Sequence, residues 1–201
     1  MENYVITISR QFGSLGRSIS KKMSENLGIS FYDRDIVEAT AKRMGLPTSM
    51  ISDQEEQSNS IFYRRQYPLG IGLVSMQQEI FSVQENIIRD LTAKESCIIV
   101  GRCGNSILRD HKNSLNVYIY APYKKRLANC IDTLHMDKKT AYKYIKTVDR
   151  ARENYRRRFG GQSESLLEEY DLLIDSSKYG VDGTAQILCN IVKENEIRDK
   201  I

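Results

Sequence analysis

Residues 4 to 28 constrain the fold more than any other part of this chain. The run YVITIS (4 to 9) is hydrophobic and strand-like, and the next seven residues, RQFGSLG (10 to 16), contain two glycines. Beyond them three apolar residues recur every four positions before a glycine that suits a helix end: Ile19, Met23 and Leu27. The stretch therefore predicts a strand, a glycine turn and a helix, which together begin a βαβ unit.

Four further segments have the composition of strands, and helical patterns lie between them. They are ISFYD (29 to 33), CIIVG (97 to 101), LNVYIYA (115 to 121) and DLLID (171 to 175). The runs CIIV and LLI are wholly apolar, which favours strands covered on both faces. The pattern predicts an α/β fold with a parallel sheet of roughly five strands and right-handed crossovers.

Two intervals are longer than a simple crossover requires. Residues 34 to 96 contain at least two helical stretches, the second near residues 74 to 94, around a polar segment at 52 to 70. Residues 123 to 160 contain a short basic helix and then the run DKKTAYKYIKTVDRARENYRRRF. We expect both intervals to be helical insertions in one domain that spans residues 1 to 201.

The second insertion carries an amphipathic pattern with arginines on a separate face. Its apolar residues define one buried stripe: Ala141, Ile145, Val148, Ala151, Tyr155 and Phe159. By the same spacing Asp149, Arg152 and Arg156 share another face. Aligned guanidinium groups suit phosphate binding, whereas the alternative interpretation is a solvated basic face.

The glycine turn lies between a strand and a helix, as a phosphate-binding loop does, but its residues match the usual motif only in part. The usual motif is G-x-x-x-x-G-K-[ST]; here Gly16 and Ser18 fit, Arg17 replaces the lysine and Gln11 replaces the first glycine. Glycines let the backbone approach an oxygen closely, and arginine offers a planar cationic fork. We favour phosphate binding over a purely structural turn, because the turn also leads into a helix N-terminus.

Composition limits the partners and the cellular compartment. The chain has 201 residues, 30 basic and 26 acidic, a net charge of +4 and a pI near 8.8, which suits an anionic partner such as a nucleotide. The four cysteines form no C-x-x-C pair, so we expect reduced thiols and no zinc. No secretory signal or apolar run of about 20 residues is present, which predicts a cytoplasmic protein with no membrane partner.

Several of these segments, in order along nearly the whole chain, resemble the cytidylate kinase-like family. They are ISRQFGSLGRSIS, FYDRD, IIVGRCGNSILRD, NVYIYAP and the D-x-x-R-x-x-Y pattern in VDRARENY. The resemblance implies a three-layer fold of the P-loop NTPase type, with an acceptor-binding insertion (34 to 96) and a lid (123 to 160). It also implies a nucleoside monophosphate kinase that transfers the γ-phosphoryl group of ATP, with Mg²⁺, to CMP or dCMP.

The resemblance implies roles for particular residues. Those expected to cradle the donor phosphates are Gly13, Ser14, Leu15, Gly16, Arg17 and Ser18, with Arg17 standing in for the lysine and Ser18 as the Mg²⁺ ligand. Those expected to contact the acceptor are Asp33, Arg34 and Arg102. In the lid, Arg152 and Arg156 would close over the phosphates, with Asp149 orienting a guanidinium. Arg17 fits the G-S-x-G-R loop typical of the family, although true cytidylate kinases have a lysine there. The chain departs from the pattern at Leu15, where many relatives have glycine, and at Cys103, which replaces the Asp of the G-R-D motif.

Alternatives to this kinase interpretation remain open from the sequence. A nucleotide-binding or sensor protein with a degenerate loop would also explain Arg17. A nucleic-acid-binding protein would use the basic helix at 150 to 158, but no familiar groove-reading motif accompanies it, so we favour a nucleotide. Asp33 or Asp35 could simply cap the following helix. The acceptor's identity and the oligomeric state are not determined by any of these patterns.

Overall fold

A sheet of five parallel strands forms the centre of the computed structural model, which describes residues 3–56, 73–161 and 165–198. The strands are β1 (Val5–Arg10), β2 (Ser30–Tyr32), β3 (Cys97–Val100), β4 (Ser114–Tyr120) and β5 (Leu172–Asp175). Their order across the sheet is β2-β3-β1-β4-β5, and every neighbouring pair is parallel. The first strand therefore lies in the middle, and its carboxyl end leads into the glycine turn.

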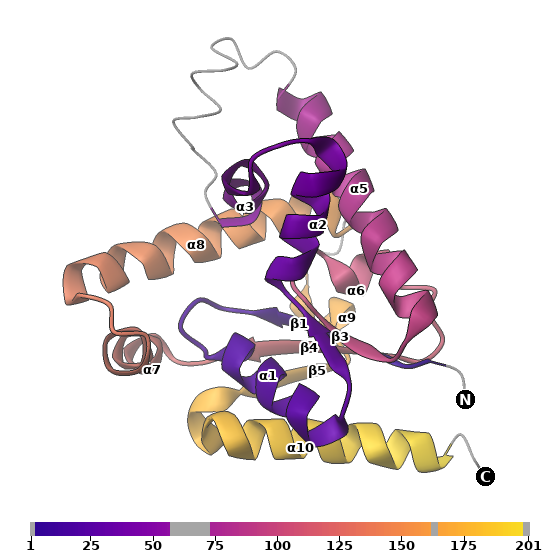
Figure 1. The fold of residues 1–201 in the computed structure, drawn as a ribbon. Coiled ribbons are helices and arrows are strands. Elements are labelled where there is room, and N and C mark those ends of the chain that lie inside the picture. The colour runs from indigo at the N-terminus through magenta and orange to yellow at the C-terminus, as the bar shows by residue number, and fades with distance from the viewer. Residues whose placement is uncertain (1–2, 57–72, 162–164, 199–201) are drawn as a thin grey trace.

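Helices cover both faces of the sheet (Figure 1). One face carries α1 (Gly16–Leu27) and α10 (Ser176–Arg198), which pack against each other. On the other side lie α2 (Arg34–Met44), α3 (Thr48–Glu56), α5 (Leu73–Lys94), α6 (Gly104–Ile107) and α8 (Lys138–Phe159). The remaining helices are α7 (Tyr123–Ala128), the π-helical turn Asn129–Thr133 and α9 (Leu166–Glu169). This is a three-layer α/β arrangement.

Alternation along the strands divides the core between the two faces. Ile6 and Ile8 of β1 pack with Ile98 and Val100 of β3 in the cluster under α1 and α10. Val5 packs with Cys97 and Ile99 in the cluster under α2, α5 and α8. Because every residue of CIIV is buried, this strand is apolar on both faces, as its sequence predicts.

The structure confirms the predicted fold class and the main amphipathic patterns. All five predicted strands form, and no end differs from its predicted position by more than one residue. In α8 the predicted stripe is buried from Ala141 to Tyr155, and Phe159 packs partly buried against the core. The polar segment at 52 to 70 falls mostly outside the described residues, apart from the end of α3.

Within residues 3–56, 73–161 and 165–198, no helix is both long enough and apolar enough to cross a membrane.

Candidate active site

The loop between β1 and α1 is held in an unusual backbone conformation. Gly13 has φ +78°, and a Cβ added there would lie 2.8 Å from the carbonyl oxygen of Arg126, so a side chain would clash. Leu15 is also left-handed (φ 61°) and precedes the first turn of α1 without a side-chain capping bond. The backbone therefore turns sharply into a helix N-terminus, where amide groups can face an anion.

Ser14 holds this loop in place through its side chain. Its hydroxyl is buried and donates to the carbonyl oxygens of Gln11 (2.9 Å) and Ile119 (3.2 Å). Its own carbonyl oxygen accepts a bond from the hydroxyl of Ser176 at 2.8 Å. The Ser14 hydroxyl is thus a structural group of the loop and does not face a ligand.

Arg17 and Ser18 are exposed on the first turn of α1, and Arg17 reaches toward the end of β2. Its Nε lies 3.0 Å from Oδ2 of Asp33, and Nη2 of Arg10 lies 3.7 Å from Oδ1 of the same carboxylate. Asp33 is buried and occupies the N-cap position of α2, yet its side chain makes no capping bond. Of the two predicted acceptor residues after β2, Asp33 lies beside Arg17, whereas Arg34 is exposed on α2.

The turn after β3 is also left-handed, over three consecutive residues. Gly101, Arg102 and Cys103 have φ values of 78°, 57° and 53°. A left-handed conformation costs about 1 kcal/mol or more for a residue with a side chain. The strained turn keeps Arg102 buried at the carboxyl end of the sheet, where the sequence predicts an anion contact.

The carboxylate of Asp149, on α8, joins three parts of the structure. Its Oδ1 accepts the backbone N–H of Phe12 at 2.7 Å, and its Oδ2 pairs with Nη1 of Arg126. The same Nη1 donates to the carbonyl oxygen of Phe12 at 3.2 Å. Asp149 thus pairs with the guanidinium of buried Arg126 on α7, and through Phe12 its carboxylate also ties α8 to the glycine loop.

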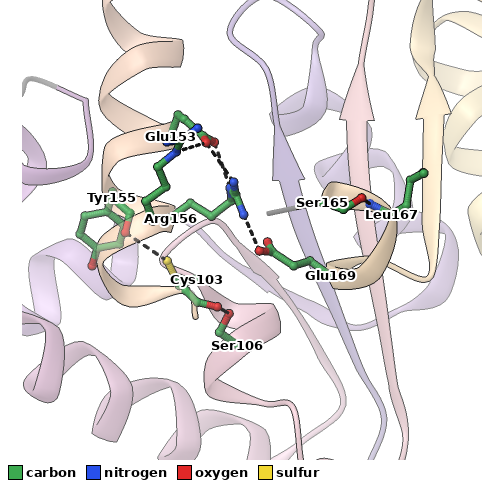
Figure 2. A network of polar contacts seen from close by, with 10 residues as sticks. Cys103, Ser106, Glu153, Tyr155, Arg156, Ser165, Leu167 and Glu169 are labelled. Atoms are coloured by element: carbon green, nitrogen blue, oxygen red, sulfur yellow. Dashed lines mark hydrogen bonds and ion pairs between the residues drawn. The ribbon is translucent and has the colours of Figure 1, made fainter. Parts of the chain in front are cut away.

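The two predicted lid arginines have different surroundings. Nη1 of Arg152 donates to the carbonyl oxygen of Arg10 at 3.2 Å, which places it at the end of β1. Arg156 forms two bonds of 2.9 Å with the carboxylate of Glu153, and its Nη1 pairs with Glu169 (Figure 2). Arg156 is therefore enclosed between two carboxylates at the end of α8.

The pKa values of this cluster follow its geometry. Hydrogen bonds from Arg156 lower the pKa of Glu153 to about 2, although burial opposes that shift. Burial raises the pKa of Glu169, although Arg156 opposes that shift. Hydrogen bonding to Glu153 raises the pKa of Arg156 above its ordinary value, so this guanidinium is permanently charged.

A pocket of about 220 Å³ opens where these elements meet, at the carboxyl ends of β1, β3 and β4. Four arginines line it, Arg10, Arg102, Arg152 and Arg156, and so do two carboxylates, Asp149 and Glu153. Other lining residues include Gln11, Asn105, Tyr118 and Tyr170. With four cations against two anions, and with Arg126 also beside Asp149, the pocket favours an anionic ligand.

Sequence reasoning overlooked several residues of this pocket. Arg10 is the last residue of β1, so it lies at the carboxyl edge of the sheet, as Arg102 does after β3. A cation at the end of a buried strand is the sequence pattern that could have identified it. Tyr118 and Tyr170 face each other with ring centroids 5.2 Å apart, and burial raises the pKa of both phenols. No spacing rule could pair these tyrosines, because they come from different strands and loops.

Comparisons with known proteins identify the family and the fold of this chain. The family model described as the cytidylate kinase-like family matches residues 5–178. A solved structure of an uncharacterised protein from Eubacterium ventriosum is similar with a TM-score of 0.71 and 24% identity, over 95% of this chain and 99% of that one. Two shikimate kinases share the fold: that of Acinetobacter baumannii, in complex with shikimate (TM-score 0.53, 13% identity, 96% and 94% coverage), and that of Bacteroides thetaiotaomicron (0.56, 9%, 94% and 98%). No curated protein matches the sequence significantly.

Proposed function

The chain belongs to the cytidylate kinase-like family, and from that premise we propose that it transfers the γ-phosphoryl group of ATP to CMP or dCMP. The observation that carries this proposal is the convergence of Arg10, Arg102 and Arg152 on one pocket beside the glycine loop. Phosphoryl transfer needs little covalent help, so positioned cations supply most of the catalysis.

On the donor side, the backbone from Gly13 to Ser18 would surround the phosphates, and Arg17 would take the place of the usual lysine. Mg²⁺ fits here because Ser18 offers an exposed hydroxyl oxygen, and this ion readily takes its other ligands from phosphates and water. When bound, Mg²⁺ neutralises phosphate charge. Arg17 would hold the donor through a guanidinium, which suits phosphate geometry.

On the acceptor side, Arg102 and Arg152 would bind the phosphate of the nucleoside monophosphate within the pocket. Arg34, exposed on the first turn of α2, would contact the acceptor from the insertion at 34 to 96. Asp149 and Arg126 would keep the lid helix against the loop, because both bond to the backbone of Phe12. We assign Arg156 to holding the end of α8, since Glu153 and Glu169 already share its guanidinium.

The test is ADP production from ATP and Mg²⁺ with CMP, dCMP, UMP, AMP and GMP offered in turn, with a no-acceptor control. Shikimate belongs in the panel because two proteins of the same fold are shikimate kinases. We expect turnover selective for CMP or dCMP, and an Arg152→Ala variant that loses kcat more than ATP affinity. Turnover with another acceptor alone would overturn the proposed acceptor.

A nucleotide-binding protein without transferase activity is the second candidate. Arg17 supports it, because the residue that replaces the usual lysine already contacts the carboxylate of Asp33 at 3.0 Å. Such a protein would bind ATP and release no ADP with any acceptor in the panel. ADP release that depends on CMP would exclude this candidate.

A further inference from the structure

Asp33 stands between two arginines that belong to opposite sides of the candidate site. Its carboxylate lies 3.0 Å from Nε of Arg17, on the first turn of α1, and 3.7 Å from Nη2 of Arg10, at the end of β1. Arg10 lines the pocket, whereas Arg17 follows the glycine loop. One carboxylate therefore contacts the cations of both regions.

The burial of Asp33 indicates that these contacts are its main role. Only 6% of the residue is exposed, and a buried carboxylate is costly unless it is paired. Asp33 occupies the N-cap position of α2, where an aspartate usually accepts backbone N–H bonds, but it makes none through its side chain. The carboxylate thus contacts the arginines and does not cap the helix that follows it.

Arg17 needs such an anchor more than a lysine would. Its side chain is 53% exposed, and a long exposed side chain samples many rotamers that a ligand must then restrict. A contact at Nε holds the guanidinium by its inner nitrogen, while about half of the side chain stays accessible to a bound phosphate. The anchor reduces the ordering that ATP binding must impose.

We propose that Asp33 is a positioning residue, which holds Arg17 toward the donor phosphates and Arg10 in the pocket, and does not itself bind the acceptor. This inference rests on the proposed function, since it deepens the account of the same site. Removing a negative charge beside an anion site would ordinarily strengthen anion binding. If Asp33 positions Arg17, its removal instead weakens the binding of ATP.

The first experiment measures the ATP dissociation constant by calorimetry, without any acceptor, in a double-mutant cycle. The variants are Asp33→Asn, Arg17→Met and the two combined, and Asp35→Asn is the matched control. Asp35 lies two residues further on, in the first turn of α2, and is exposed. Its variant removes the same charge from nearly the same place. We expect Asp33→Asn to weaken ATP binding about 10-fold alone and less than about 2-fold when Arg17 is already Met. The control should change it less than about 2-fold.

Other results would overturn the proposal. If Asp33 only repels the anion, Asp33→Asn will tighten ATP binding. If Asp33 contacts the acceptor, the variant will raise the KM for CMP and leave ATP binding unchanged. Equal effects of Asp33→Asn with and without Arg17 would show that the carboxylate does not act through this arginine, and failure of the wild-type protein to bind ATP would remove the donor site itself.

A second variant separates positioning from folding. Asp33→Glu keeps the charge, so we expect it to retain the folded circular dichroism spectrum and to recover more ATP affinity than Asp33→Asn. If Asp33→Asn fails to fold, Asp33→Glu takes its place in the cycle with Arg17→Met. We then expect the longer side chain to weaken ATP binding about 3-fold alone and not when Arg17 is already Met, and equal effects in the two backgrounds would overturn the proposal. A wild-type protein that binds ATP but transfers to no acceptor contradicts the proposed function alone, because the binding cycle still tests Asp33.

Discussion

Arg17 and Arg156 lie in two regions that use the same side chain in opposite ways. Arg17 is 53% exposed beside one carboxylate, at the start of α1. The side chain of Arg156 is 13% exposed and contacts two carboxylates, of which Glu169 is only 4% exposed. The first arginine stays accessible, whereas the second completes a partly buried ionic network (Figure 2).

The difference shows that charge and spacing do not determine what an arginine does. The family resemblance implies a phosphate contact for both residues, and Arg156 also lines the pocket. Two carboxylates around one guanidinium leave the Arg156 cluster with no net positive charge, so it adds little attraction for an anion. Arg156 joins α8 to α9 through its ion pair with Glu169, whereas Arg17 stays exposed beside the glycine loop.

The largest expected effect comes from removing the enclosed arginine. Arg156→Met leaves the carboxylate of Glu169 buried and without its cation, so we expect the free energy of unfolding to fall by about 3 kcal/mol. Arg157→Met is the control, because Arg157 also bonds to Glu153 but is 73% exposed, and it should cost less than about 0.5 kcal/mol. Urea denaturation measures both. Equal losses of unfolding free energy in the two variants would show that the burial of Arg156 between two carboxylates does not add to stability.

A smaller and different effect is expected from the exposed arginine. Arg17→Met should reduce ATP affinity about 10-fold, or about 1.4 kcal/mol, because a charge-assisted bond to phosphate is lost. The free energy of unfolding should change by less than about 1 kcal/mol, since Arg10 remains near Asp33. Calorimetric ATP titration and urea denaturation on the same variant give both numbers. Unchanged affinity would place the donor phosphates elsewhere.

The smallest effect is a pH dependence of the enclosed cluster. The pKa of Glu153 is lowered to about 2 from an ordinary 4.5, so its contribution to stability is present above pH 4.5 and is lost as the pH falls toward 2. The side chain is 39% exposed, and solvent screening limits that contribution to about 1 kcal/mol or less.

The variant Glu153→Gln tests this dependence. We expect its difference in unfolding free energy from the wild-type protein to be largest near pH 6 and to shrink by pH 3, in urea denaturation across that range. Glu38→Gln, at an exposed position on α2, serves as the control. A difference that grows toward acid pH would contradict the assigned pairing with Arg156.

The fold could be predicted from the sequence because its signals are local. Apolar runs such as CIIV and the stripe of α8 depend on neighbours two to four residues away, and the structure reproduces both. Arg102 was predicted at the carboxyl edge of the sheet because it directly follows a strand, and the pocket lies at that edge, where β1 and β3 end side by side.

The pairings within the site could not be predicted in the same way. Helical spacing places Asp149 on the face of Arg152, but it cannot show that Arg126 of α7 is the actual partner. Asp33 contacts Arg10 and Arg17 because β2 and β1 are separated by one strand and both end at the same edge. Such contacts depend on tertiary geometry, and no pattern in one chain encodes them.

The hydrogen bond from Ser176 to the glycine loop affects when this loop can reach its folded form during synthesis. The hydroxyl of Ser176 joins the carbonyl oxygens of Ser14 and Tyr120, across 162 residues of sequence in the first case. The central strand likewise has both neighbours, β3 and β4, in later parts of the chain. During synthesis, the loop is made well before Ser176 and reaches its final form only after that residue has emerged, so a shorter nascent chain holds no finished site.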